Sequence, residues 1–190
     1  MQRALRAVAA ALALTAAAAS ADEIEVGSTT LVASDEGVLL NADFAFDLTA
    51  RLEDALEKGV PLYFVFEFES YRPRWYWLDE KVGDASRLTK LSFHALTRTY
   101  RLNTGTLHQS YPTLDEAIRA LTRVRGWEVL PRSALKADTS YHAYVRMRLD
   151  TTLLPKPFQV SALANRDWTL ASAWKKWQVN GSLPVSEAAQ

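Results

Sequence analysis

The sequence contains no cysteine, so neither a disulfide bond nor a cysteine-bound metal ion can stabilise the fold. The same absence excludes a lipid anchor attached to a cysteine. A single domain of this size can bury about 70% of the surface of its unfolded chain. We therefore expect a hydrophobic core, rather than covalent cross-links, to stabilise this protein.

Histidine is scarce, and the motifs of common enzymes are missing. His94, His108 and His142 lie far apart, and none belongs to a pair with metal-ligand spacing. The sequence also lacks G-x-S-x-G, H-E-x-x-H, a phosphate-binding loop and a dinucleotide-binding glycine motif. We therefore expect no metal and no cofactor. A three-histidine site assembled by folding is the alternative.

The sequence has no excess of positive or negative charge, and it contains one short apolar run. Its 22 basic and 22 acidic residues give a formal net charge of zero. Nucleic-acid-binding domains are usually strongly basic, so we expect no nucleic-acid partner. The apolar run at residues 7–19 is shorter than the roughly 20 residues of a membrane-spanning helix, and no later run approaches that length.

The N-terminal residues have the three parts of a secretory signal peptide. Arg3 and Arg6 precede the apolar run, and small residues follow it at positions 19–21. This pattern predicts a signal peptide at residues 1–21, cleavage before Asp22 and a periplasmic mature protein. An uncleaved membrane anchor is the alternative.

Residues 61–77, PLYFVFEFESYRPRWYW, predict the central strand of the fold. Side chains alternate between the two faces of a strand, and four large apolar residues share one face: Leu62, Phe64, Phe66 and Phe68. Tyr63 and Val65 make the opposite face apolar at the start, whereas Glu67 is typical of a face in contact with water.

The remaining pattern predicts a mainly β domain. Further strands are expected at 23–33, 38–46, 127–130, 139–150 and 168–179, with a hairpin at 87–103 that turns near 95–98. Amphipathic helices are expected at 47–58 and 113–125, a helical turn at 160–164 and a polar connection at 78–86.

These elements favour an antiparallel β-sandwich with two short helices at its edges. An α+β sheet with both helices on one face is the second choice. We expect one β-rich domain at residues 22–180 and a flexible tail at residues 181–190.

Two groups of residues are candidates for function. Glu67 and Glu69 lie about 7 Å apart on one face of the central strand, a separation compatible with glycoside hydrolysis. The second group combines guanidinium groups, lysines and large aromatic rings: Arg72, Arg74, Trp75, Tyr76, Trp77, Trp174, Lys175, Lys176 and Trp177. Such residues can bind an anionic envelope component, a glycan or a partner protein. Alternatively, the tryptophans belong to the core and the cations cover their edges.

Five segments together resemble a family: FVFEFESYRPRWYW, FHALTRTYRL, YPTLDEAIRAL, LPKPFQVSAL and DWTLASAWKKW. The chain resembles, over residues 22–180, a proteobacterial family of exported proteins with a domain of unknown function. Members of this family are often encoded beside a nitrogen-regulation-type membrane sensor kinase, which implies an accessory role. The family supplies no established active site.

The sequence therefore favours a non-catalytic periplasmic binding or accessory module. Its expected partner is the extracytoplasmic part of a membrane sensor or an anionic envelope component, contacted through Arg72, Arg74, Trp75, Trp77, Lys175, Lys176 and Trp177. A periplasmic hydrolase that uses Glu67 and Glu69 with an arginine is the alternative.

Overall fold

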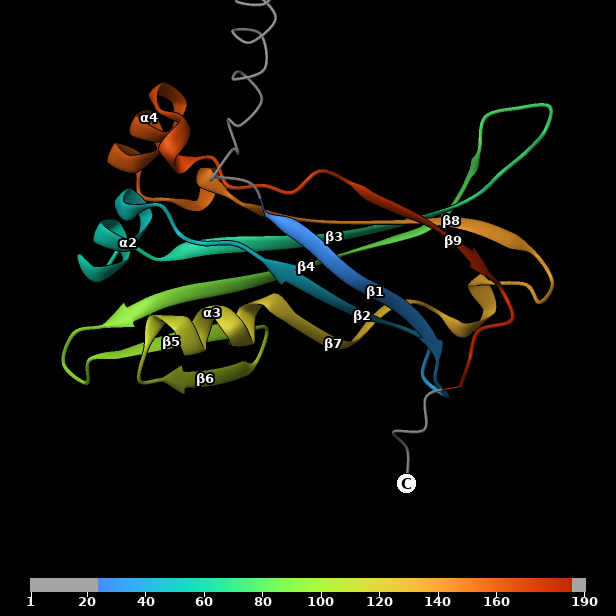
Figure 1. Ribbon diagram of the computed structural model, residues 1–190, viewed down its shortest axis with the longest axis horizontal. Coiled ribbons are helices and arrows are strands. Elements are labelled where there is room, and N and C mark those ends of the chain that lie inside the picture. The colour runs from blue at the N-terminus through green and yellow to red at the C-terminus, as the bar shows by residue number, and fades with distance from the viewer. Residues whose placement is uncertain (1–23, 186–190) are drawn as a thin grey trace, which may run out of the picture.

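The computed structural model describes residues 24–185 and consists mainly of two antiparallel sheets (Figure 1). The smaller sheet contains, in spatial order, β1 (Glu25–Ala33), β2 (Val38–Ala45) and β7 (Arg123–Leu130). The larger sheet contains, in spatial order, β6 (Leu107–Tyr111), β5 (Thr99–Thr104), β4 (Glu80–His94), β3 (Leu62–Arg72), β8 (Ser140–Leu149) and β9 (Lys175–Asn180). The prediction of a mainly β, antiparallel domain is confirmed.

Within residues 24–185, three short α-helices accompany the sheets, whereas the sequence predicted two helices and a helical turn. They are α2 (Ala50–Glu57), α3 (Leu114–Thr122) and α4 (Lys156–Ala164). The side chain of Thr49 caps α2 by accepting a hydrogen bond from the Leu52 amide. Gly59, just after this helix, has φ +87°, a conformation that glycine adopts without strain.

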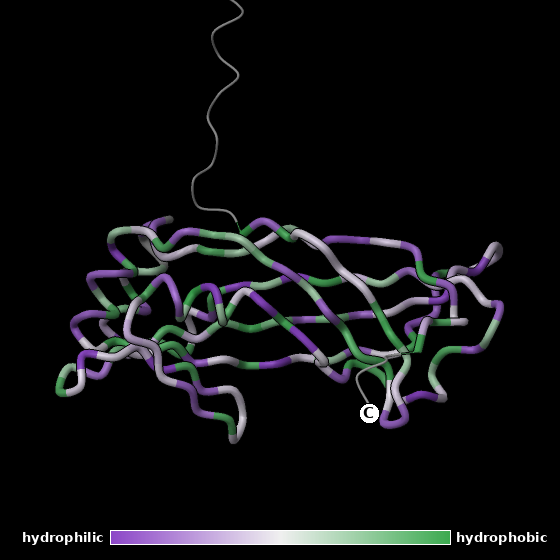
Figure 2. Tube along the Cα trace, turned by 60° about the horizontal axis from the view of Figure 1, so that its bottom comes forward, coloured by the Kyte–Doolittle hydropathy of each residue, from purple (hydrophilic) through white to green (hydrophobic). Residues whose placement is uncertain are grey.

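The core lies between the two sheets. In Figure 1, β1 and β2 run obliquely across β3 and β4, and Figure 2 shows hydrophobic and hydrophilic residues alternating along the crossing strands. The ring of Phe44 on β2 meets that of Phe66 on β3 edge-on, with centroids 5.4 Å apart. The guanidinium carbon of Arg87 lies 5.2 Å from the ring centroids of both Phe66 and Trp127.

β3 is the central strand that the sequence predicted. It pairs with β4 on one side and with β8 on the other. The side chains that share its inner face are fully buried: Leu62, Phe64, Phe66 and Phe68. On the outer face Val65 is buried and Glu67 is partly exposed. The predicted change from an apolar to a water-contacting outer face is therefore confirmed.

The expected polar connection at residues 78–86 is wrong for most of its length, because β4 begins at Glu80. Pairing with β3 extends over this segment, with Ser86 opposite Glu67 and Asp84 opposite Glu69. The polar side chains of this segment can lie on the outer face of the sheet, in contact with water. Its backbone N–H and C=O groups form the hydrogen bonds that pair β4 with β3. The predicted hairpin turn at 95–98 is confirmed.

The second helix is shorter than predicted, because the chain enters β7 at Arg123. Its predicted cap is present, since the Thr113 hydroxyl accepts a hydrogen bond from the Glu116 amide at 3.3 Å. Gly126 has φ +57° and lies within β7, where the pairing with β2 is irregular. Pairing with β2 therefore overrides the helical pattern that continues to residue 125.

The last predicted strand, 168–179, begins only at Lys175. Trp168 belongs to a 3-10 turn at Arg166–Trp168 and packs against Phe158 of α4, with ring centroids 5.5 Å apart. Burial of Trp168 and Leu170 therefore reflects packing of irregular chain rather than a strand face.

The predicted signal peptide at residues 1–21 lies outside the described residues, as do residues 186–190 of the predicted tail. The Ala33 amide donates a hydrogen bond to the Pro184 carbonyl at 2.8 Å, so the start of this tail lies beside β1. Between residues 24 and 185, no helix is both long enough and apolar enough to cross a membrane.

Candidate functional site

The loop between β3 and β4, residues 73–79, exposes four consecutive large side chains. The exposed fractions are 94% for Trp75, 66% for Tyr76, 73% for Trp77 and 82% for Leu78. The loop extends beyond the sheets at one end of the molecule (Figure 1, green). Clustered exposed apolar side chains often mark an interaction surface. These aromatic residues lie outside the core.

Ion pairs close the base of this loop. Arg72 and Arg74 both contact the Glu80 carboxylate, and the Arg74 guanidinium nitrogen lies 2.7 Å from Glu80 Oε2. The hydrogen bonds from Arg74 and Arg72 lower the pKa of Glu80, so this carboxylate stays ionised at neutral pH. The two arginines expected to bind an anion therefore already hold one within the protein.

The β9 residues named from the sequence are divided between the two faces of the larger sheet. Trp177 lies on the inner face of the sheet, with its ring centroid 6.4 Å from that of Phe68. Lys176 faces outward, and its ammonium nitrogen lies 5.5 Å from the ring centroid of Tyr144. Lys175 points inward again, because neighbouring residues of a strand face opposite sides.

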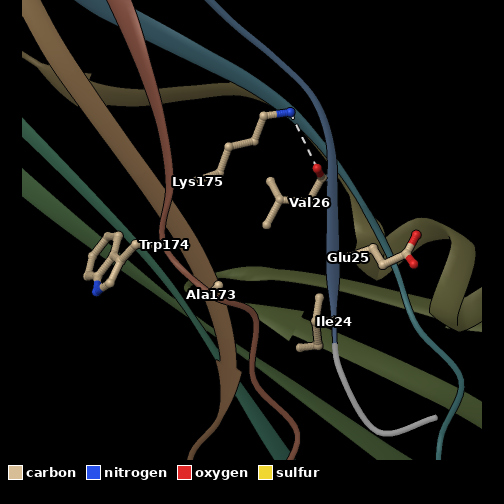
Figure 3. Close-up of a pocket in the computed structure, with 6 residues that line it drawn as sticks. All are labelled: Ile24, Glu25, Val26, Ala173, Trp174 and Lys175. Carbon is tan, nitrogen blue, oxygen red and sulfur yellow. Dashed lines mark hydrogen bonds between the residues drawn. The ribbon is translucent and has the colours of Figure 1, made fainter. Parts of the chain in front are cut away.

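Lys175 crosses the gap between the edges of the two sheets. Its ammonium group donates hydrogen bonds to the carbonyl oxygens of Val26, at 3.3 Å, and Gly27. Figure 3 shows Lys175 directed toward Val26, whereas the ring of Trp174 points away from this strand. Lys175 is therefore a link between the sheets, and a ligand would have to break its hydrogen bonds.

A hollow of about 370 Å³ lies beside this link (Figure 3). It is lined by Ile24, Glu25, Val26, Ala173, Trp174 and Lys175. The only charged groups in the lining are Glu25 and Lys175, and Lys175 is engaged by β1. The hollow is thus a gap between the edges of the two sheets, and its lining residues do not form a group of catalytic side chains.

The carboxylate pair predicted from the sequence lies on the outer face of the larger sheet, but arginines hold Glu67. Arg146 Nε donates to the Glu67 carboxylate, and Arg148 Nε lies 3.3 Å from Glu67 Oε2. Burial alone would raise the pKa of Glu67, yet the hydrogen bonds from these arginines outweigh it and lower the pKa. A general acid for glycoside hydrolysis requires a raised pKa. Glu67 therefore does not suit that role.

A second hollow, of about 340 Å³, lies on the same outer face near the base of the β3–β4 loop. It is lined by Glu69, Tyr71, Asp79, Tyr144 and Trp174. Sequence reasoning singled out Glu69 and Trp174 for other reasons and missed the other three as site residues. The missing signal was the pairing of β3 with β8, which places Glu69 opposite Tyr144.

The histidines lie on three different strands of the larger sheet, β4, β6 and β8. His94 Nδ1 is 2.9 Å from the Thr97 hydroxyl, and His142 Nδ1 is 3.8 Å from an Asp79 carboxylate oxygen. Within the part of the chain that the structure describes, no group of three or more His, Asp or Glu side chains is placed to hold a metal ion.

The fold and surface define a two-sheet β domain with an exposed aromatic loop. The chain belongs to the family described as Domain of unknown function (DUF4390), whose model matches residues 21–178. No curated protein and no solved structure matches the chain significantly.

Proposed function

We propose that this protein is a non-catalytic binding module whose contact surface is the β3–β4 loop. The observation that carries this proposal is the exposure of Trp75, Tyr76, Trp77 and Leu78 in direct succession. Trp and Tyr are the residues most enriched where binding energy concentrates in protein interfaces. The ion pairs of Arg72 and Arg74 with Glu80 hold the base of the loop, which lowers the entropy lost on binding.

The geometry favours a protein partner over an anionic envelope component. Arg72, Arg74 and Lys175 already make charged hydrogen bonds within the protein, and a competing anion would have to replace those bonds. Among the four cations predicted to bind a ligand, the side chain of Lys176 alone has neither an ion pair nor a hydrogen bond to the described residues 24–185, whereas Lys175 donates hydrogen bonds to backbone carbonyls. The aromatic loop can instead insert its side chains into recesses of a partner surface.

The extracytoplasmic part of a membrane sensor kinase is the candidate partner that the family resemblance supplies. Its location would match a periplasmic protein, which the pattern at residues 1–21 supports. Cleavage before Asp22 would be visible as the intact mass of protein recovered from the periplasm. Protein that retains residues 1–21 and fractionates with membranes would contradict the periplasmic proposal.

A crosslinking pull-down from the periplasm of a native host tests the binding surface. The wild-type protein is compared with Trp75→Ala/Trp77→Ala and with the control Leu96→Ala, which removes another highly exposed apolar side chain, in the β4–β5 turn. We expect the wild-type protein and the control to capture the same partner and the double variant to lose it. All three proteins should have equal melting temperatures. Equal capture by the double variant would refute the loop as the contact surface.

A further inference from the structure

We propose that the outer-face hollow binds a guanidinium or alkylammonium group, such as the end of an arginine or lysine side chain. This site is separate from the exposed loop aromatics, and its ligand chemistry follows from its own lining. Three aromatic rings and two carboxylates surround it: Tyr71, Tyr144, Trp174, Glu69 and Asp79. Aromatic faces attract cations, and carboxylates provide hydrogen-bond acceptors for them.

The lining selects for positive charge. Its formally charged residues are the carboxylates Glu69 and Asp79, and it contains no lysine or arginine. Three cations of the protein contact lining residues, namely Lys81, Arg146 and Lys176. The volume of about 340 Å³ is near the lower end of the roughly 300–1,000 Å³ of small-ligand sites. The hollow therefore fits a single charged group with its neighbouring atoms rather than a long stretch of polymer.

Strand pairing holds one side of the site in place. Glu69 lies opposite Tyr144 in the β3–β8 ladder, and the rings of Tyr71 and Tyr144 meet edge-on with centroids 5.6 Å apart. The Tyr71 hydroxyl donates a hydrogen bond to Glu69 Oε2 at 2.9 Å. The hydrogen bond to Glu69 raises the pKa of Tyr71, so the hydroxyl keeps its proton and its role as donor.

Cations of the protein itself already contact the rings of this site. The guanidinium carbon of Arg146 lies 4.5 Å from the ring centroid of Trp174, and the ammonium nitrogen of Lys176 lies 5.5 Å from that of Tyr144. These contacts occupy one side of each ring, so a bound cation would have to approach the rings from the hollow. A bound cation would add a further contact between a positive charge and an aromatic ring.

The two carboxylates differ in how far they are neutralised. Lys81 Nζ lies 3.2 Å from Glu69 Oε1, and the Tyr71 hydroxyl binds the other oxygen. Asp79 is exposed, and its one ionic neighbour among residues 24–185 is the His142 imidazole at 3.8 Å. That distance exceeds hydrogen-bond length. Asp79 is therefore the carboxylate with acceptor capacity for an incoming cation.

Calorimetric titration of the full-length exported protein with small probes tests this site without any protein partner. The probes are N-acetyl-arginine methylamide, N-acetyl-lysine methylamide, free methylguanidinium and N-acetyl-citrulline methylamide. Citrulline has nearly the shape of arginine but no charge. We expect saturable binding of at least one basic derivative and none of the citrulline derivative. If methylguanidinium also binds, the natural ligand can be a free small cation. If only the amino-acid derivatives bind, the ligand is an arginine or lysine side chain of a peptide.

Two variants locate the binding. Asp79→Asn should weaken binding of the basic probe about tenfold, because a charge-assisted hydrogen bond is lost. Tyr144→Leu should also weaken it, whereas Leu96→Ala in the β4–β5 turn should bind as the wild-type protein does. The shift of the Trp174 indole resonance on titration provides a second measurement. Equal affinity for the arginine and citrulline probes, or no saturable binding of any basic probe, would overturn the proposal. Either result leaves the pull-down test of the β3–β4 loop unaffected.

Discussion

The guanidinium group of Arg146 lies over the indole ring of Trp174, with its carbon 4.5 Å from the ring centroid. The same guanidinium group donates to the carboxylate of Glu67. A row of three side chains thus connects β3, β8 and the segment before β9. Because Trp174 lines both hollows near the sheet edge, this contact helps to define their shapes.

Replacing Arg146 with lysine should weaken this row although the charge is kept. An ammonium group lacks the planar fork that binds a carboxylate and stacks on an indole. We expect Arg146→Lys to lower the free energy of unfolding by about 0.5–2 kcal/mol, measured by urea denaturation. The control Arg98→Lys alters an exposed turn residue and should stay within about 0.5 kcal/mol. Equal stability of both variants would show that planarity is unimportant at position 146.

The ion pairs of Glu67 predict a defined dependence of stability on pH. Its pKa is lowered in the folded protein from the reference value of 4.5, despite the opposing effect of burial. A carboxylate with a lowered folded-state pKa stabilises the fold above its unfolded-state pKa. That contribution disappears as the pH falls from about 4.5 through the lower folded-state value.

Glu67→Gln should therefore destabilise the protein at pH 7 by about 1.5 kcal/mol, the low end for hydrogen bonds to charged groups, because the site is partly exposed. The difference from the wild-type protein should shrink as the pH is lowered below about 4.5. Urea denaturation between pH 7 and pH 3 measures both effects. Glu36→Gln, at an exposed position, serves as the control. A difference that is constant over this pH range would contradict the assignment.

The central strand provides the test of the core. Phe66 is fully buried and contacts Phe44 across the two sheets. Phe66→Ala should lower the free energy of unfolding by about 3–5 kcal/mol, because it removes buried apolar surface and leaves a cavity. Leu96→Ala should have an effect within about 0.5 kcal/mol, since Leu96 is 92% exposed. Similar effects of the two substitutions would mean that the sheets do not pack through Phe66.

The elements predicted correctly are those with one face in the core. Alternation along β2, β3 and β8 follows directly from burial of every second residue, so the sequence alone indicates them. β6 was missed because its residues are mostly exposed and carry no alternation. That strand forms by pairing with β5, which aligns Tyr111 with Tyr100.

Some features of the candidate sites can be predicted from local sequence, whereas others depend on how distant strands pair. Exposure of Trp75 and Trp77 agrees with their place beside Pro73, which interrupts regular pairing. Lys176 does not share a face with Lys175 and Trp177, because neighbouring residues of the β9 strand face opposite sides of the sheet. The outer-face hollow depends on the register between β3 and β8, which places Glu69 opposite Tyr144, and no local pattern predicts that register.

The last prediction concerns the base of the β3–β4 loop. Glu80 joins Arg72 to Arg74, and Glu80→Gln replaces this ionised acceptor with a neutral amide. We expect global stability to change little, because surface ion pairs contribute little to it, while the loop becomes more mobile. Nuclear magnetic relaxation of the Trp75 and Trp77 indoles would detect that mobility, and capture of the partner in the pull-down should fall in parallel. Arg72→Lys/Arg74→Lys should act in the same direction, since two ammonium groups cannot reproduce the guanidinium contacts. Indole relaxation and partner capture both equal to those of the wild-type protein would show that Glu80 does not order the loop.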